Sequence, residues 1–259
     1  MPIVADESPI LVYQMGKVGS RTVFETLAAL GLRRSLYHLH MLNGLDAVER
    51  ALRARAAPTP SALEHLGHSR RVRQLFQART PRHWNVVTLV RDPVARNLSS
   101  FFYNIHDYIP DFDPRAACDV HALQHCFLER FDHAAALTWF DDQFVDPLGL
   151  DVFDTRFDAE AGFEIRKTDR LSVLLMRAED IDAHLARALA ALLGFESVEV
   201  RSVNHARDKD YGRCYRECMQ HVRLPDAYLD VMYDSRLAQH FYSARELREF
   251  RERWSGKTP

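Results

Sequence analysis

The sequence lacks the features that mark membrane-spanning, disulfide-rich or polyanion-binding proteins. Its longest apolar run, 188–195, is far shorter than the roughly 20 residues that cross a bilayer. Lysine and arginine number 34 against 36 aspartate and glutamate, so no global charge attracts nucleic acid or an anionic surface. Four cysteines in 259 residues do not make a disulfide framework, which favours a reducing compartment. The first residues show no basic segment followed by an apolar one, so we expect no signal peptide, no membrane anchor and a cytoplasmic protein.

Internal repeats and low-complexity tracts are also missing, and short apolar strands alternate with amphipathic helices. This order predicts an α/β fold: a single three-layer domain over 1–259 with a mostly parallel central sheet, similar to nucleotide kinases. A helical insertion is expected at 44–80 and a helical C-terminal segment at 209–259. The predicted strands are 10–15, 36–42, 85–90, 163–167, 171–177 and 198–203. The predicted helices include 46–56, 61–79, 115–131, 133–144 and 179–193.

A glycine-bearing turn follows the first predicted strand and leads into the first helix. It reads Gly16-Lys17-Val18-Gly19-Ser20-Arg21-Thr22. A helix N-terminus after such a turn offers N–H groups and positive dipole to an anion, and Lys17 adds an ammonium group. The lysine precedes Gly19 instead of following the second glycine, so the spacing excludes a Walker A loop. The turn therefore indicates a phosphate or sulfate site, unless the glycines only shape a tight strand–helix connection.

A second basic motif follows the central predicted strand. It reads Arg91-Asp92-Pro93-Val94-Ala95-Arg96-Asn97-Leu98-Ser99. Arg91 is placed at the carboxyl end of its strand, where open α/β sheets bind ligands. Its planar fork of donors suits a phosphate monoester, and the Ser99 hydroxyl, two helical turns further on, could reach the same oxygens. The alternative is an arginine paired with a nearby aspartate and a solvated serine.

Together the two motifs resemble those of sulfotransferases that use 3′-phosphoadenosine-5′-phosphosulfate (PAPS). The resemblance implies transfer of a sulfuryl group to a hydroxyl, with adenosine 3′,5′-bisphosphate as product and no metal. It implies that Lys17, Arg21 and Thr22 hold the 5′-phosphosulfate within the loop formed by Gly16, Val18, Gly19 and Ser20. Many members have a small hydroxyl residue in place of Arg21, so Arg21 is either an extra anion clamp or an outward-facing residue. It also implies that Arg91 and Ser99 hold the 3′-phosphate.

Three weaker similarities to the same family lie downstream. Segment 174–180 resembles its strand followed by Glu-Asp, and 204–211 with Lys209 resembles a basic loop that closes over the nucleotide, unless it is a plain solvated loop. The segment 240–243, His-Phe-Tyr-Ser, resembles the ending of bacterial members associated with capsular polysaccharide synthesis. We therefore expect a carbohydrate or glycolipid hydroxyl as the acceptor.

Two histidines are candidates for the base that removes the acceptor's proton. His38 and His40 alternate along the second predicted strand, so they share one face of it. The pair resembles the His-x-His segment of carbohydrate 2-O-sulfotransferases, which implies that His40 is the base, with Lys17 stabilising the leaving oxygen. His38, a carboxylate such as Glu49, or hydrogen-bonded core histidines with no catalytic part remain open.

Other groupings are given structural roles. Cys214, Cys218 and His221 could face one side of a helix, but no fourth ligand is nearby and we expect no metal site. Trp139-Phe140 is interpreted as a core aromatic pair and not as a sugar platform. Two other functions stay open: a kinase or NTPase, which would need Walker A and a magnesium-binding carboxylate, and a non-catalytic nucleotide-binding protein of polysaccharide assembly.

Overall fold

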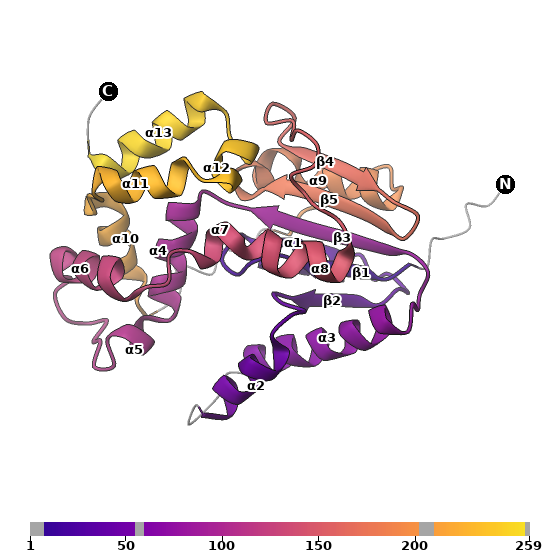
Figure 1. Ribbon diagram of the computed structural model, residues 1–259, viewed down its shortest axis with the longest axis horizontal. Coiled ribbons are helices and arrows are strands. Elements are labelled where there is room, and N and C mark those ends of the chain that lie inside the picture. The colour runs from indigo at the N-terminus through magenta and orange to yellow at the C-terminus, as the bar shows by residue number, and fades with distance from the viewer. Residues whose placement is uncertain (1–7, 55–59, 202–209, 257–259) are drawn as a thin grey trace. The chain divides into compact units, whose positions relative to one another are not determined.

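The computed structural model of the chain describes residues 8–54, 60–201 and 210–256. These residues form two compact units, which Figure 1 shows in one ribbon. The described residues of the first unit come from 1–90 and 139–202, and those of the second from 91–138 and 203–259.

A five-stranded sheet forms the core of the first unit. Its strands are β1 (Ile10–Tyr13), β2 (Leu36–Leu39), β3 (Trp84–Val90), β4 (Phe163–Lys167) and β5 (Leu171–Arg177), in the order β2-β1-β3-β5-β4. All neighbouring strands are parallel except β4 and β5, which are antiparallel. The predicted α/β class and mostly parallel sheet are thereby confirmed.

The composition of the strands follows their position in the sheet. Every residue of β1, β3 and β5 is buried, as expected for central strands that are covered on both faces. The edge strand β4, Phe-Glu-Ile-Arg-Lys, alternates apolar and charged residues and none of its side chains is fully buried. Charged side chains on an edge strand also discourage pairing with another chain.

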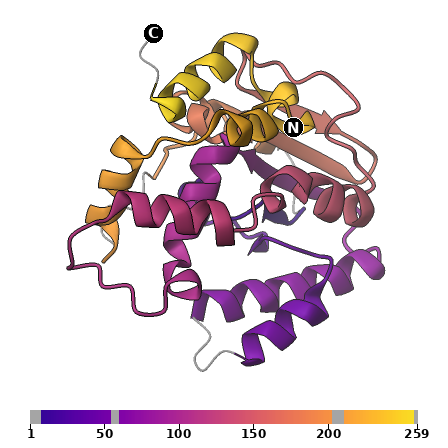
Figure 2. The same cartoon turned by 60° about the vertical axis from the view of Figure 1, so that its left-hand side comes forward.

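Helices of the first unit pack against particular strands. They are α1 (Ser20–Ala29), α2 (Leu45–Ala54), α3 (Pro60–Gln77), the short α8 (Asp146–Leu148) and α9 (Ile181–Leu193), with a π-helical turn, η1 (Asp141–Val145), and a 3-10 turn, η2 (Ala178–Asp180). Helix α1 contacts β1 and β2, α9 contacts β4 and β5, and α3 lies along β2 (Figure 1). Figure 2 shows α2 beside α3, with which it is in contact. Gly31, with φ 59°, follows the C-cap of α1 in the left-handed conformation that is common for a C′ glycine.

The described residues of the second unit are helical. The elements are α4 (Pro93–Tyr103), α5 (Ile105–Tyr108), α6 (Val120–Arg130), α10 (Gly212–His221), α11 (Asp226–Tyr233), α12 (Arg236–Phe241) and α13 (Ala244–Ser255); α7 (Ala135–Phe140) ends in the first unit. Pro93 occupies the first turn of α4, and Ser243 with Glu246 forms the capping box of α13.

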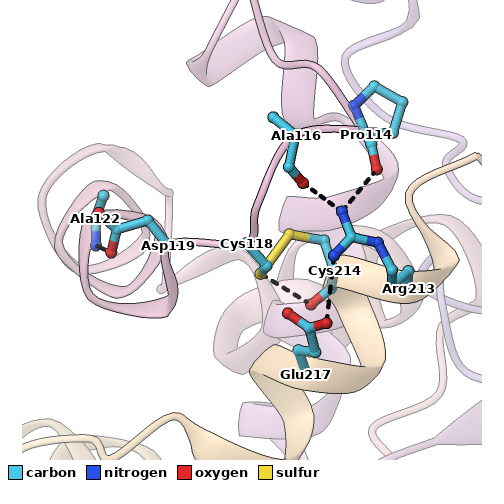
Figure 3. The surroundings of a disulfide bond; sticks show 8 residues. All are labelled: Pro114, Ala116, Cys118, Asp119, Ala122, Arg213, Cys214 and Glu217. Carbon is cyan, nitrogen blue, oxygen red and sulfur yellow. Dashed lines mark hydrogen bonds and ion pairs between the residues drawn. A yellow bond between two sulfur atoms is a disulfide. The ribbon is translucent and has the colours of Figure 1, made fainter.

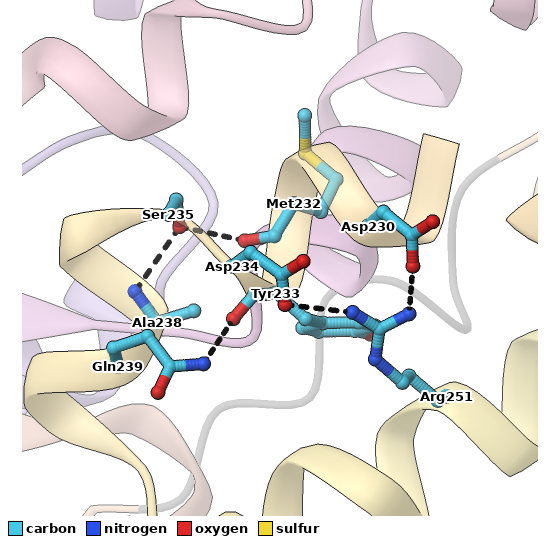
Figure 4. Close-up of polar contacts among 8 residues, drawn as sticks. All are labelled: Asp230, Met232, Tyr233, Asp234, Ser235, Ala238, Gln239 and Arg251. Carbon is cyan, nitrogen blue, oxygen red and sulfur yellow. Dashed lines mark hydrogen bonds and ion pairs between the residues drawn. The ribbon is translucent and has the colours of Figure 1, made fainter. Parts of the chain in front are cut away.

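A guanidinium group ties α13 to α11, as Figure 4 shows. Arg251 pairs with Asp230 at 2.5 Å and with Asp234 at 2.9 Å, and it lies 5.7 Å from the centre of the Tyr233 ring. Ser235 caps α12 by accepting a hydrogen bond from the Ala238 amide. One charged side chain therefore fixes the spacing of two helices that both also contact the buried Asp92 described below.

A disulfide between Cys118 and Cys214 joins the segment before α6 to α10 (Figure 3). Arg213 reinforces the junction by donating to the carbonyl groups of Pro114 and Ala116. The sequence, whose four cysteines indicated no disulfide framework and favoured a reducing compartment, did not predict this bond. Cys126 and Cys218 are free and buried. Because Cys214 is bonded to Cys118, its sulfur is not available to a metal together with Cys218 and His221.

Two predicted elements differ from those observed. The expected strand at 198–203 is irregular chain over 198–201, and its last two residues lie outside the described part. The helix expected from 115 begins only at Val120, because Asp119 caps it by accepting from the Ala122 amide. Within the described ranges, no helix has the length and apolar character needed to cross a membrane.

Candidate functional site

The loop between β1 and α1 has the backbone of an anion-binding turn. Lys17 and Gly19 both have left-handed backbone conformations, with φ of 74° and 88°. Gly19 is the residue before α1, no side chain among the described residues caps this helix end, and its first turn carries no acidic residue. A left-handed turn that opens an uncapped helix directs backbone N–H groups and the positive end of the helix dipole outward.

Gly19 is required at its position for two reasons. A left-handed φ is costly for any residue with a Cβ atom. A Cβ atom at Gly19 would also lie 2.6 Å from Cδ1 of Ile181, the first residue of α9. The loop therefore packs closely against α9. Val18, the residue between Lys17 and Gly19, is fully buried.

The remaining loop side chains differ in where they point. Ser20 is buried at the start of α1, and Thr22 is half-buried. Arg21 is exposed and pairs with Glu25 at 3.0 Å, one helical turn along α1. Of the two roles that the sequence leaves to Arg21, an anion clamp or an outward-facing residue, this contact favours the second.

In the second unit, Asp92 of the Arg91–Ser99 motif has a structural part. Its carboxylate accepts hydrogen bonds from the Val94 amide, the Tyr233 hydroxyl and the Trp254 indole, and so caps α4. Burial raises the pKa of Asp92 above its usual range, and the hydrogen bonds from Trp254, Tyr233 and Val94 act against that rise. The aspartate that follows Arg91 is thus held by α11 and α13.

The basic and hydroxyl residues of this motif lie around the start of α4. Arg91 comes directly after Val90, the last residue of β3, and is half-buried. Ser99 lies on α4 and is 8% exposed. Arg96 donates to Asn97 at 3.0 Å, and burial lowers the pKa of Arg96 to about 10. Lys209, predicted as a nucleotide contact, lies outside the described residues.

A cluster of histidines lies at the carboxyl end of β2 in the first unit. The rings of His38 and His40 are 5.1 Å apart between centroids, as their shared strand face predicts. His65 of α3 completes the cluster, with its ring 4.6 Å from that of His38 and 4.5 Å from that of His40. Burial lowers the pKa of His38 to about 2, and the nearby imidazole and Arg21 guanidinium groups further disfavour a positive charge on it, so this ring is neutral.

Backbone carbonyl groups orient the two outer rings. Nδ1 of His40 lies 2.8 Å from the carbonyl oxygen of Gln14, and Nδ1 of His65 lies 2.9 Å from that of His38. A carbonyl oxygen can only accept, so each Nδ1 carries a proton, and in the neutral form of each ring the lone pair is on Nε2. Trp139 donates to the carbonyl oxygen of His40 at 2.9 Å and is itself almost fully buried, which confirms its core position.

Sequence reasoning missed His65, His68 and Gln14. Gln14 is fully buried directly after β1 and contacts both strand histidines. Its side-chain nitrogen lies 3.3 Å from Nε2 of His38, and its backbone carbonyl oxygen accepts the hydrogen bond from His40 given above. His68 bonds to the backbone of His38. The spacing His65-x-x-His68 on a predicted helix was the available signal, but nothing local showed that this helix packs against β2.

Comparison with protein families gave one finding of relevance. The NKWYS family, described as "putative capsular polysaccharide synthesis protein", matches residues 119–243, slightly less than half of the chain. The match ends at Ser243, the last residue of the segment that resembles polysaccharide-associated sequences, and contains neither phosphate motif. Comparisons with curated proteins and with solved structures gave no match.

Proposed function

We propose that the protein is a PAPS-dependent sulfotransferase that acts on a carbohydrate or glycolipid hydroxyl. The observation that carries the proposal is the loop from Gly16 to Gly19, with its two left-handed residues and the uncapped start of α1. This backbone suits a terminal phosphate or sulfate, and its lysine lies where PAPS enzymes place theirs and where Walker A loops do not. The proposal includes the three-layer, nucleotide-kinase-like fold of sulfotransferases.

The sheet topology supports the assignment of both nucleotide motifs. Strand β1 connects to β2 on one side, whereas β3 pairs with β1 on the other side, so the chain changes direction between β1 and β3. Open α/β sheets bind ligands outside the carboxyl ends of strands at such a switch point. The loop with Lys17 follows β1, and Arg91 follows β3. In the proposal, Lys17 and Thr22 hold the 5′-phosphosulfate, and Arg91 and Ser99 hold the 3′-phosphate.

The proposed chemistry is a single in-line transfer. The acceptor hydroxyl oxygen forms a bond to sulfur while the bond from sulfur to the bridging oxygen of the 5′-phosphate breaks. The bridging oxygen keeps the electron pair of that bond, and Lys17 stabilises its charge. His40 accepts the hydroxyl proton at Nε2, a role supported by the hydrogen bond that places its own proton on Nδ1.

The carbohydrate acceptor is inferred from the family match. The matched family is described by polysaccharide synthesis, and a sulfated glycan is a product that fits this description. The same match supports a second function, a nucleotide-binding protein of polysaccharide assembly that catalyses no transfer. The two functions differ in whether the histidine cluster takes part in chemistry.

Nucleotide binding is the first test. Calorimetry should show binding of adenosine 3′,5′-bisphosphate with the same affinity in the presence and absence of EDTA. Tighter binding of ATP with magnesium than of the bisphosphate would instead favour a kinase. The second test offers labelled PAPS and a panel of bacterial polysaccharides, glycolipids and small phenols. Binding of the bisphosphate without transfer to any of them would favour the assembly function.

A further inference from the structure

The three clustered histidines have the composition of a transition-metal site. One ring nitrogen from each of His38, His40 and His65 lies within 4.8 Å of the other two. His38 is 9% exposed, and the other two rings are half-buried. Imidazole nitrogens are common ligands of zinc, copper and nickel, whereas magnesium and calcium require oxygen ligands, which this group does not offer.

Hydrogen bonds to backbone carbonyl oxygens orient two of the rings for a metal. Metal-binding histidines commonly donate their second ring N–H to a carbonyl or carboxylate, which fixes the tautomer and aims the lone pair. His40 and His65 both do so, through the carbonyl oxygens of Gln14 and His38. Each would therefore bind a metal through Nε2, the ring nitrogen opposite this hydrogen bond.

The amide of Gln14 can supply the same support to His38. Its side-chain oxygen is buried and has no hydrogen-bond partner among the described residues, while its nitrogen faces Nε2 of His38. The two ends of an amide are exchanged by a half turn. After that turn the oxygen accepts the Nε2 proton of His38, and Nδ1 of His38 is left with the lone pair.

We propose that His38, His40 and His65 bind a divalent transition-metal ion, with Zn²⁺ as the expected ion and water as its fourth ligand. Tetrahedral zinc with bonds of roughly 2.0–2.1 Å needs nitrogens about 3.3 Å apart. The nitrogens must therefore approach by up to about 1.5 Å from the 4.8 Å limit. His40 follows the end of β2 and His65 lies on a separate helix, so side-chain rotation can supply this movement.

Binding of the metal has a consequence that rests on the proposed function. Zinc on His40 would occupy the Nε2 lone pair that accepts the acceptor's proton. The metal is therefore an inhibitor of transfer and not a cofactor, and EDTA should maintain or raise the transfer rate. Because metal binding is measured without donor or acceptor, it can be tested even if no acceptor is found.

The experiment titrates the metal-free protein with Zn²⁺ and, separately, with Co²⁺, whose visible absorption is intense in tetrahedral sites. Wild type is compared with His65→Ala and with His65→Gln, which can still donate to the His38 carbonyl but is not a zinc ligand. A control variant, His121→Ala/His125→Ala, removes two exposed histidines on α6. Because they are spaced four residues apart, they lie on one face of the helix and could bind Zn²⁺ non-specifically.

Both His65 variants should lose at least about tenfold in Zn²⁺ affinity, together with the tetrahedral Co²⁺ spectrum. The control variant should retain both, and Mg²⁺ should not compete. The proposal is overturned if His65→Gln binds like wild type while folded, or if the α6 variant is the one that loses binding. Absence of any tetrahedral Co²⁺ signal in wild type would overturn it as well.

Discussion

Substitution of Gly19 by alanine tests whether the proposed phosphate loop is held in its observed conformation. The new Cβ meets two separate costs. A left-handed backbone costs a residue with Cβ about 1–2 kcal/mol. Contact with Ile181 Cδ1 at 2.6 Å adds an overpacking cost of about 1–3 kcal/mol, reduced if that side chain rotates. The free energy of unfolding should therefore fall by about 2–5 kcal/mol, a large part of the 5–15 kcal/mol typical of a domain.

Denaturant unfolding measures this loss, and two further variants separate its causes. Gly16→Ala is the matched control in the same loop, because its Cβ would meet no atom within 4 Å and its φ is not left-handed. Its stability should change by less than about 1 kcal/mol. Ile181→Val removes only the atom that the new Cβ would meet, and alone it should cost about 0.5–1.5 kcal/mol.

The double variant Gly19→Ala/Ile181→Val isolates the contact. If the clash contributes, the valine substitution should cost less, or even stabilise, in the alanine background, with a coupling of about 1 kcal/mol or more. If Gly19→Ala is no more destabilising than Gly16→Ala, neither the left-handed turn nor the contact with α9 exists as described. The nucleotide site built on this loop would then lose its main support.

Three further predictions concern the second phosphate motif, the base and the disulfide. Arg91→Ala should weaken binding of adenosine 3′,5′-bisphosphate by about 1.5–3 kcal/mol in calorimetry, and an equal loss for adenosine 5′-phosphosulfate, which lacks the 3′-phosphate, would contradict its assignment. His40→Ala, assayed in EDTA, should lower the transfer rate by roughly 10²–10⁴-fold with little change in nucleotide affinity; a rate within threefold of wild type, with chemistry rate-limiting, would move the role to His38 or a carboxylate. Cys118→Ser should destabilise the second unit by about 2–5 kcal/mol, since the bond to Cys214 closes a loop with a sequence separation of 96. Thermal unfolding of this variant should match that of reduced wild type. A stability equal to that of wild type under oxidising conditions would show that the bond is absent in solution.

The sheet was largely predictable because its signals are local. Strands β4 and β5 were placed at their observed bounds and β3 within one residue. For β3 and β5 the signal is the nearly continuous apolar run of a buried strand. Strands β1 and β2 were predicted too long. They end at Tyr13 and Leu39 because the next residues turn away from the ladder: the carbonyl oxygen of Gln14 accepts a hydrogen bond from the His40 ring.

Contacts between distant parts of the chain could not be predicted in the same way. Four cysteines permit several pairings, and nothing near Cys118 indicates that Cys214 lies beside it. The part played by Asp92 was hidden for the same reason, because two of its three hydrogen-bond donors, Tyr233 and Trp254, are more than 140 residues away. A sequence pattern shows that an aspartate can cap a helix, but not which helices enclose it.

The histidine cluster combines both kinds of information. Alternation along β2 places His38 and His40 on one face, which the sequence shows directly. His65 joins them because α3, on which it lies, packs along β2. Gln14, a fully buried polar residue, contacts both strand histidines. The side-chain nitrogen of Gln14 faces Nε2 of His38, and the backbone carbonyl oxygen of Gln14 accepts a hydrogen bond from the His40 ring. Gln14 therefore contacts both strand histidines at the point where the chain leaves β1 toward the loop with Lys17.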